Sequence, residues 1–69
     1  MKTRHHITVT RAPELGGYVI VDDIGIRRIV PGWRAAVQVL CSIAMENSSE
    51  IAATKPKIDA GETVEFRSR

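Results

Sequence analysis

The sequence has few of the residues and runs that mark easily recognised functions. It holds one cysteine, one tryptophan, one tyrosine and one phenylalanine among 69 residues. Because Cys41 is alone, it excludes an internal disulfide, and its apolar neighbours predict a small buried thiol in a reducing, cytosolic setting. The N-terminal segment MKTRHHITVTR lacks a continuous apolar stretch. We therefore expect neither a signal peptide nor a membrane anchor.

Motifs for catalysis and cofactor binding are also missing. Gly16 and Gly17 lead into a strand pattern, so they do not form the phosphate-binding loop that precedes a helix. His5 and His6 are adjacent, and neighbours on a strand point to opposite faces, which excludes the usual chelation of one metal ion. We therefore expect no enzyme activity, no cofactor and no metal site.

Length and charge place further limits on the chain. At 69 residues and 43% hydrophobic content, residues 1–69 fit a single small domain close to the size at which a core only just offsets chain entropy. Such a chain gains stability from dimerising. A net charge of +2 permits contact with nucleic acid or with an acidic protein but requires neither.

The first half of the chain predicts a three-stranded antiparallel meander, at about residues 6–12, 17–22 and 26–30. HITVTRA alternates apolar and polar residues, and YVIVDD is rich in β-branched residues, as is typical of a central strand. PELGG and DDIG supply the two reversals, with Asp22 and Asp23 able to bond nearby backbone amides.

The third strand has a less regular pattern because Arg27 and Arg28 are adjacent. Since neighbouring side chains on a strand alternate between faces, one of the two must point towards the helix-covered face or lie at its rim.

A single main helix is predicted over about residues 31–46, with Pro31 in its first turn and NSS at its end. Apolar residues recur at helical spacing and form one stripe, which we expect to pack on the sheet. This stripe consists of Trp33, Ala36, Val37, Leu40, Cys41 and Ala44.

The remainder of the chain predicts a tail and a last strand. SSEIAATK fits a loop with a turn of helix that stops before Pro56. ETVEFRS, at about residues 62–68, alternates again and predicts an edge strand that pairs with the first hairpin. The predicted fold class is therefore α+β, with the main helix packed on an antiparallel sheet.

The main helix has more apolar surface than one sheet face requires. The surplus residues are Ala35, Val39 and Ile43. In one interpretation the C-terminal tail folds back and covers them with Ile51, Ile58 or Phe66. In the other, which we favour because so short a chain has few residues for a second layer, they form a partner or dimer interface.

A basic patch is a second candidate surface. Arg27, Arg28 and Arg34 cluster before and within the start of the helix, where they could contact phosphates or the carboxylates of a protein. Residues that could extend the patch are Lys2, Arg4 and Arg11. No aromatic side chain is evidently available for base stacking, which favours a protein partner over nucleic acid. A plain solvated surface with no partner is the third interpretation of these arginines.

Residues 7–47 contain, in order, ITVTRAP, GGYVIVDD, IRRIV and the helix GWRAAVQVLCSIAMEN. This order of elements resembles the small phage-encoded anti-CRISPR proteins in architecture and size. The resemblance implies a non-enzymatic inhibitor in the host cytosol that occupies the surface of a bacterial CRISPR-Cas protein or nucleoprotein complex, often as a homodimer. No membrane partner is expected.

The same element order is also similar to HicB-type antitoxins and to double-stranded-RNA-binding domains. The LPGC-like segment typical of the antitoxins is absent. The alternative function is therefore a small nucleic-acid-binding or antitoxin-like regulator that uses the basic patch.

Overall fold

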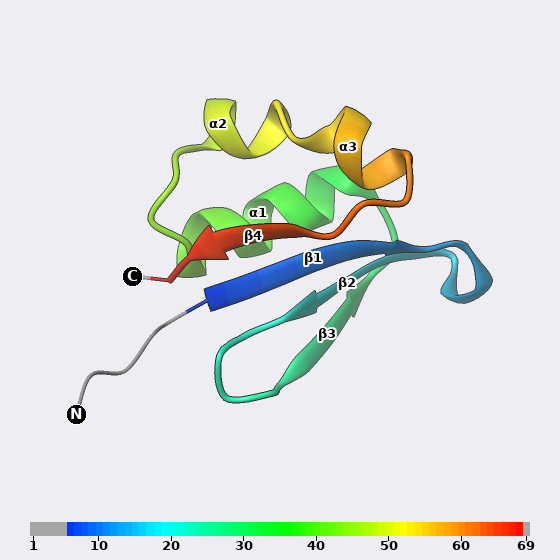
Figure 1. Ribbon diagram of the computed structural model, residues 1–69, viewed down its shortest axis with the longest axis horizontal. Coiled ribbons are helices and arrows are strands. Elements are labelled where there is room, and N and C mark those ends of the chain that lie inside the picture. The colour runs from blue at the N-terminus through cyan, green and yellow to red at the C-terminus, as the bar shows by residue number, and fades with distance from the viewer. Residues whose placement is uncertain (1–5, 69) are drawn as a thin grey trace.

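Four antiparallel strands form one sheet in the order β3-β2-β1-β4, and three helices lie on one of its faces (Figure 1). The computed structural model describes residues 6–68. The strands are β1 (His6–Ala12), β2 (Gly17–Val21), β3 (Arg27–Val30) and β4 (Val64–Arg67). The helices are α1 (Trp33–Ile43), α2 (Ser48–Ala52) and α3 (Lys55–Asp59), and a short 3-10 helix, η1 (Pro13–Leu15), joins β1 to β2. The predicted α+β class with an antiparallel sheet is confirmed.

Alternating side chains place apolar residues from each of the four strands on the helix-covered face. Directly opposed pairs on this face are Val9 with Ile20, Ile7 with Phe66 and Tyr18 with Val30. All six side chains are at most 8% exposed. Because side chains alternate with a period of two, a slip of one residue would turn this whole set towards solvent, so the apolar pattern fixes the register.

The helical layer completes the core. Helix α1 packs on β2 and β3, α3 packs on β1, and α2 packs on α1. Ala36, Leu40 and Ala44 are fully buried beneath α1, and they share one cluster with Ile51 of α2 and Ile58 of α3. The prediction that the main helix packs on the sheet is confirmed, and the tail belongs to the same core.

Two reversals fix the meander. At the first, only glycine fits at position 17, since the Cβ atom of any other residue would lie 1.9 Å from the carbonyl oxygen of Val30. At the second, Asp22 Oδ1 accepts hydrogen bonds from the amides of Ile24 (3.1 Å) and Ile26 (2.9 Å). Gly25 provides the positive φ of 88° that this turn requires. The predicted role of Asp22 as a turn residue is confirmed.

The main helix is shorter than predicted at both ends. Gly32 is its N-cap, so Pro31 lies outside the helix. At the other end Ala44 takes an extended conformation and bridges to Ser68, while the Met45 amide donates to the Arg67 carbonyl at 2.8 Å. Residues 44–46 thus leave the helix because the last strand offers their backbone groups hydrogen-bond partners that local sequence cannot reveal.

The tail is more ordered than the predicted loop. Asn47 does not end α1 but begins α2 through a capping box, in which its side chain accepts from the Glu50 amide and Glu50 Oε1 accepts from the Asn47 amide. Pro56 does not mark a stop, because it lies in the first turn of α3, where its missing amide hydrogen is not needed.

We expect the tail to contribute to global stability. Replacing Ile51, which is fully buried, with alanine should lower the free energy of unfolding by about 2–5 kcal/mol because a cavity forms. The matched substitution Ile24→Ala, at a side chain that is 74% exposed, should cost less than about 0.5 kcal/mol. Urea unfolding followed by circular dichroism measures both. Equal effects of the two substitutions would contradict the placement of α2 in the core.

Candidate functional site

The predicted interface on α1 lies against the rest of the protein. Ala35, Val39 and Ile43 are partly buried and pack against the core cluster. Helix α2 contacts α1 and brings Ile51 into that cluster. The tail therefore covers part of the surplus apolar surface of α1. The use of its exposed remainder as a partner or dimer interface stays a prediction.

The three arginines of the predicted basic patch do not share a face. Arg28 extends towards the helix-covered face, where its Nη1 is buried 3.5 Å from Asp22 Oδ2. Arg27 is its neighbour on the strand and is exposed on the opposite, uncovered face. Arg34 is exposed on the outward side of α1, away from the buried Ala36 and Leu40.

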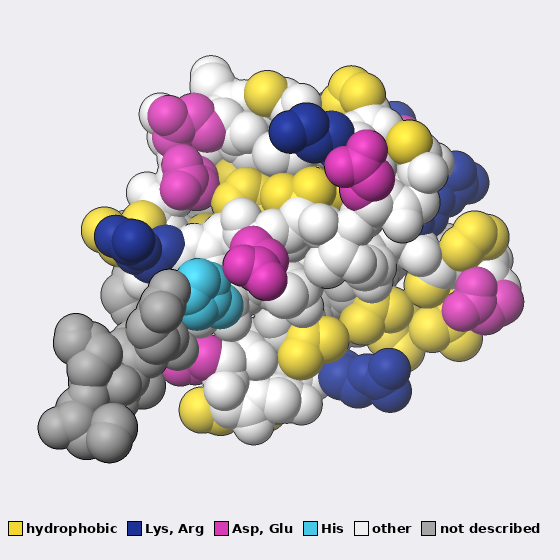
Figure 2. Space-filling view, in the orientation of Figure 1, with side chains coloured by type: hydrophobic (Ala, Val, Ile, Leu, Met, Phe, Trp, Pro, Cys, Tyr) yellow, Lys and Arg dark blue, Asp and Glu magenta, His cyan; other side chains and the backbone are white. Residues whose placement is uncertain are grey.

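Charges of both signs are interspersed on the face shown in Figure 2, and neither sign gathers into one patch there. A phosphate-tracking surface needs several basic side chains on one side of the molecule. The arrangement of Arg27, Arg28 and Arg34 therefore gives the nucleic-acid-binding alternative no specific support.

Exposed isoleucines gather on the β2–β3 hairpin. Ile24, Ile26 and Ile29 are 74%, 48% and 56% exposed, whereas Ile7, Ile20, Ile51 and Ile58 are fully buried. We define the β2–β3 surface as Ile24, Ile26, Arg27 and Ile29. Ile29 lies opposite Val19 on the sheet face that carries no helix. The hydrogen bonds of Asp22 hold the turn that presents Ile24 and Ile26.

Sequence reasoning missed this surface because it assigned the aliphatic residues of the third strand to the sheet without asking which face they occupy. A signal was present in IGIRRIV, where Arg27 and Ile29 are two residues apart and therefore share one face of the strand.

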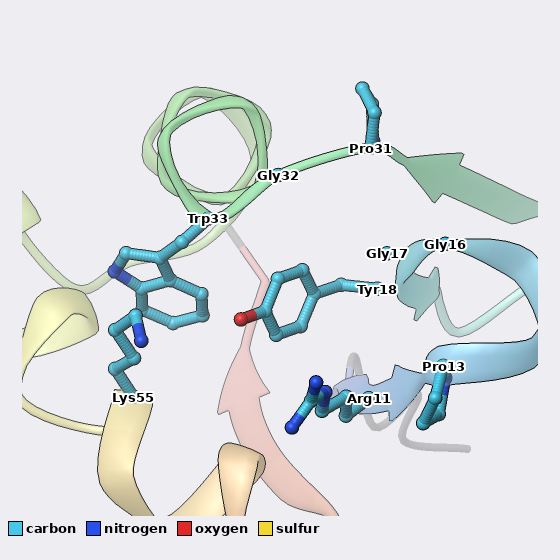
Figure 3. A pocket seen from close by; sticks show the side chains of 9 residues that line it. All are labelled: Arg11, Pro13, Gly16, Gly17, Tyr18, Pro31, Gly32, Trp33 and Lys55. Carbon is cyan, nitrogen blue, oxygen red and sulfur yellow. The ribbon is translucent and has the colours of Figure 1, made fainter.

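A solvent-accessible cleft of about 470 Å³ lies at the other end of the sheet. It lies where the β1–β2 connection meets the start of α1 and the start of α3 (Figure 3). Its lining includes Arg11, Gly16, Tyr18, Gly32, Trp33 and Lys55. We call it the basic-aromatic cleft, after its two cationic and two aromatic side chains.

Asp59 ties together two of the cleft residues. The Tyr18 hydroxyl donates to Asp59 Oδ1 at 2.9 Å, and Lys55 Nζ donates to Asp59 Oδ2 at 2.6 Å. These bonds hold the pKa of Asp59 below its usual value, with Lys55 the larger cause. The hydrogen bond to Asp59 correspondingly raises the pKa of Lys55, whereas burial and then Asp59 raise the pKa of the Tyr18 phenol.

The sequence could not place this cleft. The sequence predicts Arg11 only as an extension of the basic patch, and it predicts a loop with a turn of helix for the tail without fixing where that tail lies against the sheet. The structure brings Lys55 and Asp59 beside Tyr18, 41 residues away in sequence from Asp59.

Within residues 6–68, no three or more histidine, cysteine, aspartate or glutamate side chains come together in a metal-binding arrangement. His6 lies 3.5 Å from Glu65 Oε1, and His5 lies outside the described residues. None of the helices in that range has the length and hydrophobicity needed to cross a membrane.

Comparisons with protein families, with curated proteins and with solved structures find no match to this chain.

The Asp59 cluster predicts an acid-sensitive contribution to stability. Because the pKa of Asp59 is lower in the folded chain than its ordinary value of 3.8, the ionised group favours folding above that pH. This contribution is lost as the pH falls through the lower, folded pKa. Urea unfolding between about pH 6 and pH 2.5 should therefore show a smaller acid loss of stability in Asp59→Asn than in the wild type.

Glu62→Gln provides the control for this measurement. It removes one exposed carboxylate from the turn after α3, and that side chain makes no hydrogen bond or ion pair within residues 6–68. An identical pH dependence in Asp59→Asn and the wild type would show that the Tyr18–Asp59–Lys55 contacts do not favour the folded state.

Proposed function

We propose that this protein is a non-enzymatic inhibitor of phage or mobile-element origin that binds a bacterial CRISPR-Cas protein or nucleoprotein complex and blocks it by occupying its surface. The β2–β3 surface is the contact that this proposal assigns to the target. The proposal keeps the inhibitor class that the element order of residues 7–47 resembles, and it moves the contact from α1 to the hairpin.

The observation that carries the proposal is the exposure of three isoleucines on one hairpin. Four of the other isoleucines are completely buried and Ile43 is partly buried, so the exposure of these three stands out. Each exposed aliphatic side chain forgoes burial free energy. Clustered apolar exposure of this kind is typical of protein–protein contacts.

The chemistry of the surface also indicates what it would meet. Arg27 is exposed among the isoleucines, and arginine is enriched at protein interfaces, where its planar guanidinium pairs with carboxylates. The complementary target surface is therefore an apolar patch flanked by aspartate or glutamate. Single-stranded nucleic acid would instead need exposed aromatic rings beside the basic residues.

A plaque assay tests the proposed function. Expression of the chain in bacteria that each carry one active CRISPR-Cas type should restore plaquing of a targeted phage in at least one strain of a panel. Inhibition of the purified complex should require about one chain per binding site, since occlusion does not turn over. Failure in every strain, or inhibition at a small fraction of the target concentration, would contradict the proposal.

We expect the double variant Ile24→Ser with Ile29→Ser to lose inhibition by at least about tenfold, because it removes two apolar contacts worth roughly 1 kcal/mol or more each. Leu15→Ser is the matched control, since Leu15 is 52% exposed in η1, at the opposite end of the sheet. Circular dichroism verifies that all variants fold. Full inhibition by the double variant would remove the β2–β3 surface from the contact.

A further inference from the structure

The basic-aromatic cleft has the dimensions of a small-molecule site. Its volume of about 470 Å³ falls within the roughly 300–1,000 Å³ that is typical of ligand pockets. Three segments that are distant in sequence form it: the end of β1 with the start of β2 and their connection, residues 31–33 at the start of α1, and the start of α3. Figure 3 shows Arg11, Tyr18, Trp33 and Lys55 converging from these segments.

The charges of the cleft favour an anion. Arg11 from β1 and Lys55 from α3 line it, while Asp59 neutralises one positive charge through its 2.6 Å bond to Lys55, which leaves a net charge of +1. Within residues 6–68, the side chain of Arg11 makes no hydrogen bond or ion pair. A guanidinium can bind a phosphate through two parallel hydrogen bonds, so Arg11 can take an anionic group without breaking an existing contact.

Lys55 is held in position by contacts already made. Asp59 accepts hydrogen bonds from both the Tyr18 hydroxyl and Lys55. Tyr18 is only 8% exposed, so it fixes the carboxylate that in turn holds the flexible Lys55. An ammonium group has three donors, and Asp59 uses one of them. Lys55 can therefore donate to a second anion while it keeps its bond to Asp59.

The aromatic side chains provide an apolar wall beside these charges. The rings of Tyr18 and Trp33 meet edge to face, with centroids 5.3 Å apart and planes at 61°. Trp33 is only partly buried, so part of its indole remains available to a bound molecule. Contact with a planar ring is favourable on such a surface and is worth about 1–3 kcal/mol for a nucleic-acid base.

Two of the glycines that line the cleft have free space where a side chain would begin. A Cβ atom built on Gly16 or on Gly32 would meet no atom within 4 Å. At Gly32, where φ is −152°, any residue can adopt the backbone conformation. Gly32 therefore accepts a new side chain without strain.

From size, charge and aromatic wall together, we infer that this cleft binds a small phosphorylated molecule with a planar ring, of the size of a nucleoside monophosphate. The phosphate lies between Arg11 and Lys55, and the ring packs against Trp33. This site is separate from the β2–β3 surface, which lies at the other end of the sheet.

Trp33 is the single tryptophan, so its fluorescence reports the cleft directly. Titration of the full chain with adenosine monophosphate at low ionic strength should give a saturable change, and inorganic phosphate should reverse it. Added salt should weaken binding, because exposed charges are screened. No saturable change, or adenosine binding as tightly as the monophosphate, would overturn the inference.

Charge variants make the test specific. Arg11→Gln should weaken binding by about tenfold or more, since it removes a charge-assisted hydrogen bond to the phosphate. Lys57→Gln is the control, because it also removes one positive charge, but from an exposed residue of α3 that does not line the cleft. Equal affinities of Arg11→Gln and the wild type would refute the assigned phosphate position.

A second pair of variants tests the site without loss of any native side chain. Gly32→Asp and Gly32→Asn place side chains of nearly equal size at the N-cap of α1, where both residues are favoured. Only the aspartate adds negative charge to the cleft, so it should weaken binding of the monophosphate at least about tenfold more than the asparagine does. Indistinguishable affinities of the two folded variants would show that no anion binds there.

Discussion

The fold depends on the burial of an apolar surface on α1 that the sheet alone cannot cover. The sheet takes Ala36, Leu40 and Ala44, whereas the surplus side of the helix needs a second neighbour. Helix α2, which carries Ile51, supplies it, while α3 buries Ile58 against β1. Both helices have five residues and are too short to be stable in isolation. Tertiary contact with α1 and the sheet therefore stabilises α2 and α3, and they in turn shield the core from water.

This constraint also creates the basic-aromatic cleft. Once Ile58 is buried against β1, the polar face of α3 comes next to Tyr18, and Asp59 receives the hydroxyl hydrogen bond. Lys55 lies one turn earlier on the same face and completes the cluster. A surface that holds two cationic groups beside Trp33 thus arises from the way the tail packs, although none of these residues is adjacent in the sequence.

How much the sequence predicts follows from the range of the interactions. The strand positions and the Asp22 turn depend on alternation and on hydrogen bonds within four residues, and they were predicted to within one or two residues. The end of α1 and the path of the tail depend on partners more than 20 residues away, such as the hydrogen bond from the Met45 amide to the Arg67 carbonyl. These two features were therefore not predicted. The basic patch was divided for a local reason, because Arg27 and Arg28 alternate across the sheet.

The two proposed surfaces differ in what maintains them. Asp22, through bonds to Ile24 and Ile26, holds the turn of the β2–β3 surface, so this surface needs only the hairpin that presents it. The cleft needs β1, the start of α1 and α3 at once, and therefore the whole tail. Because local opening begins where contacts are fewest, partial loss of α2 and α3 would abolish the cleft while the hairpin persists. Conversely, a ligand that joins Arg11 to Lys55 would stabilise the tail against the sheet, because it binds only when both segments are in place.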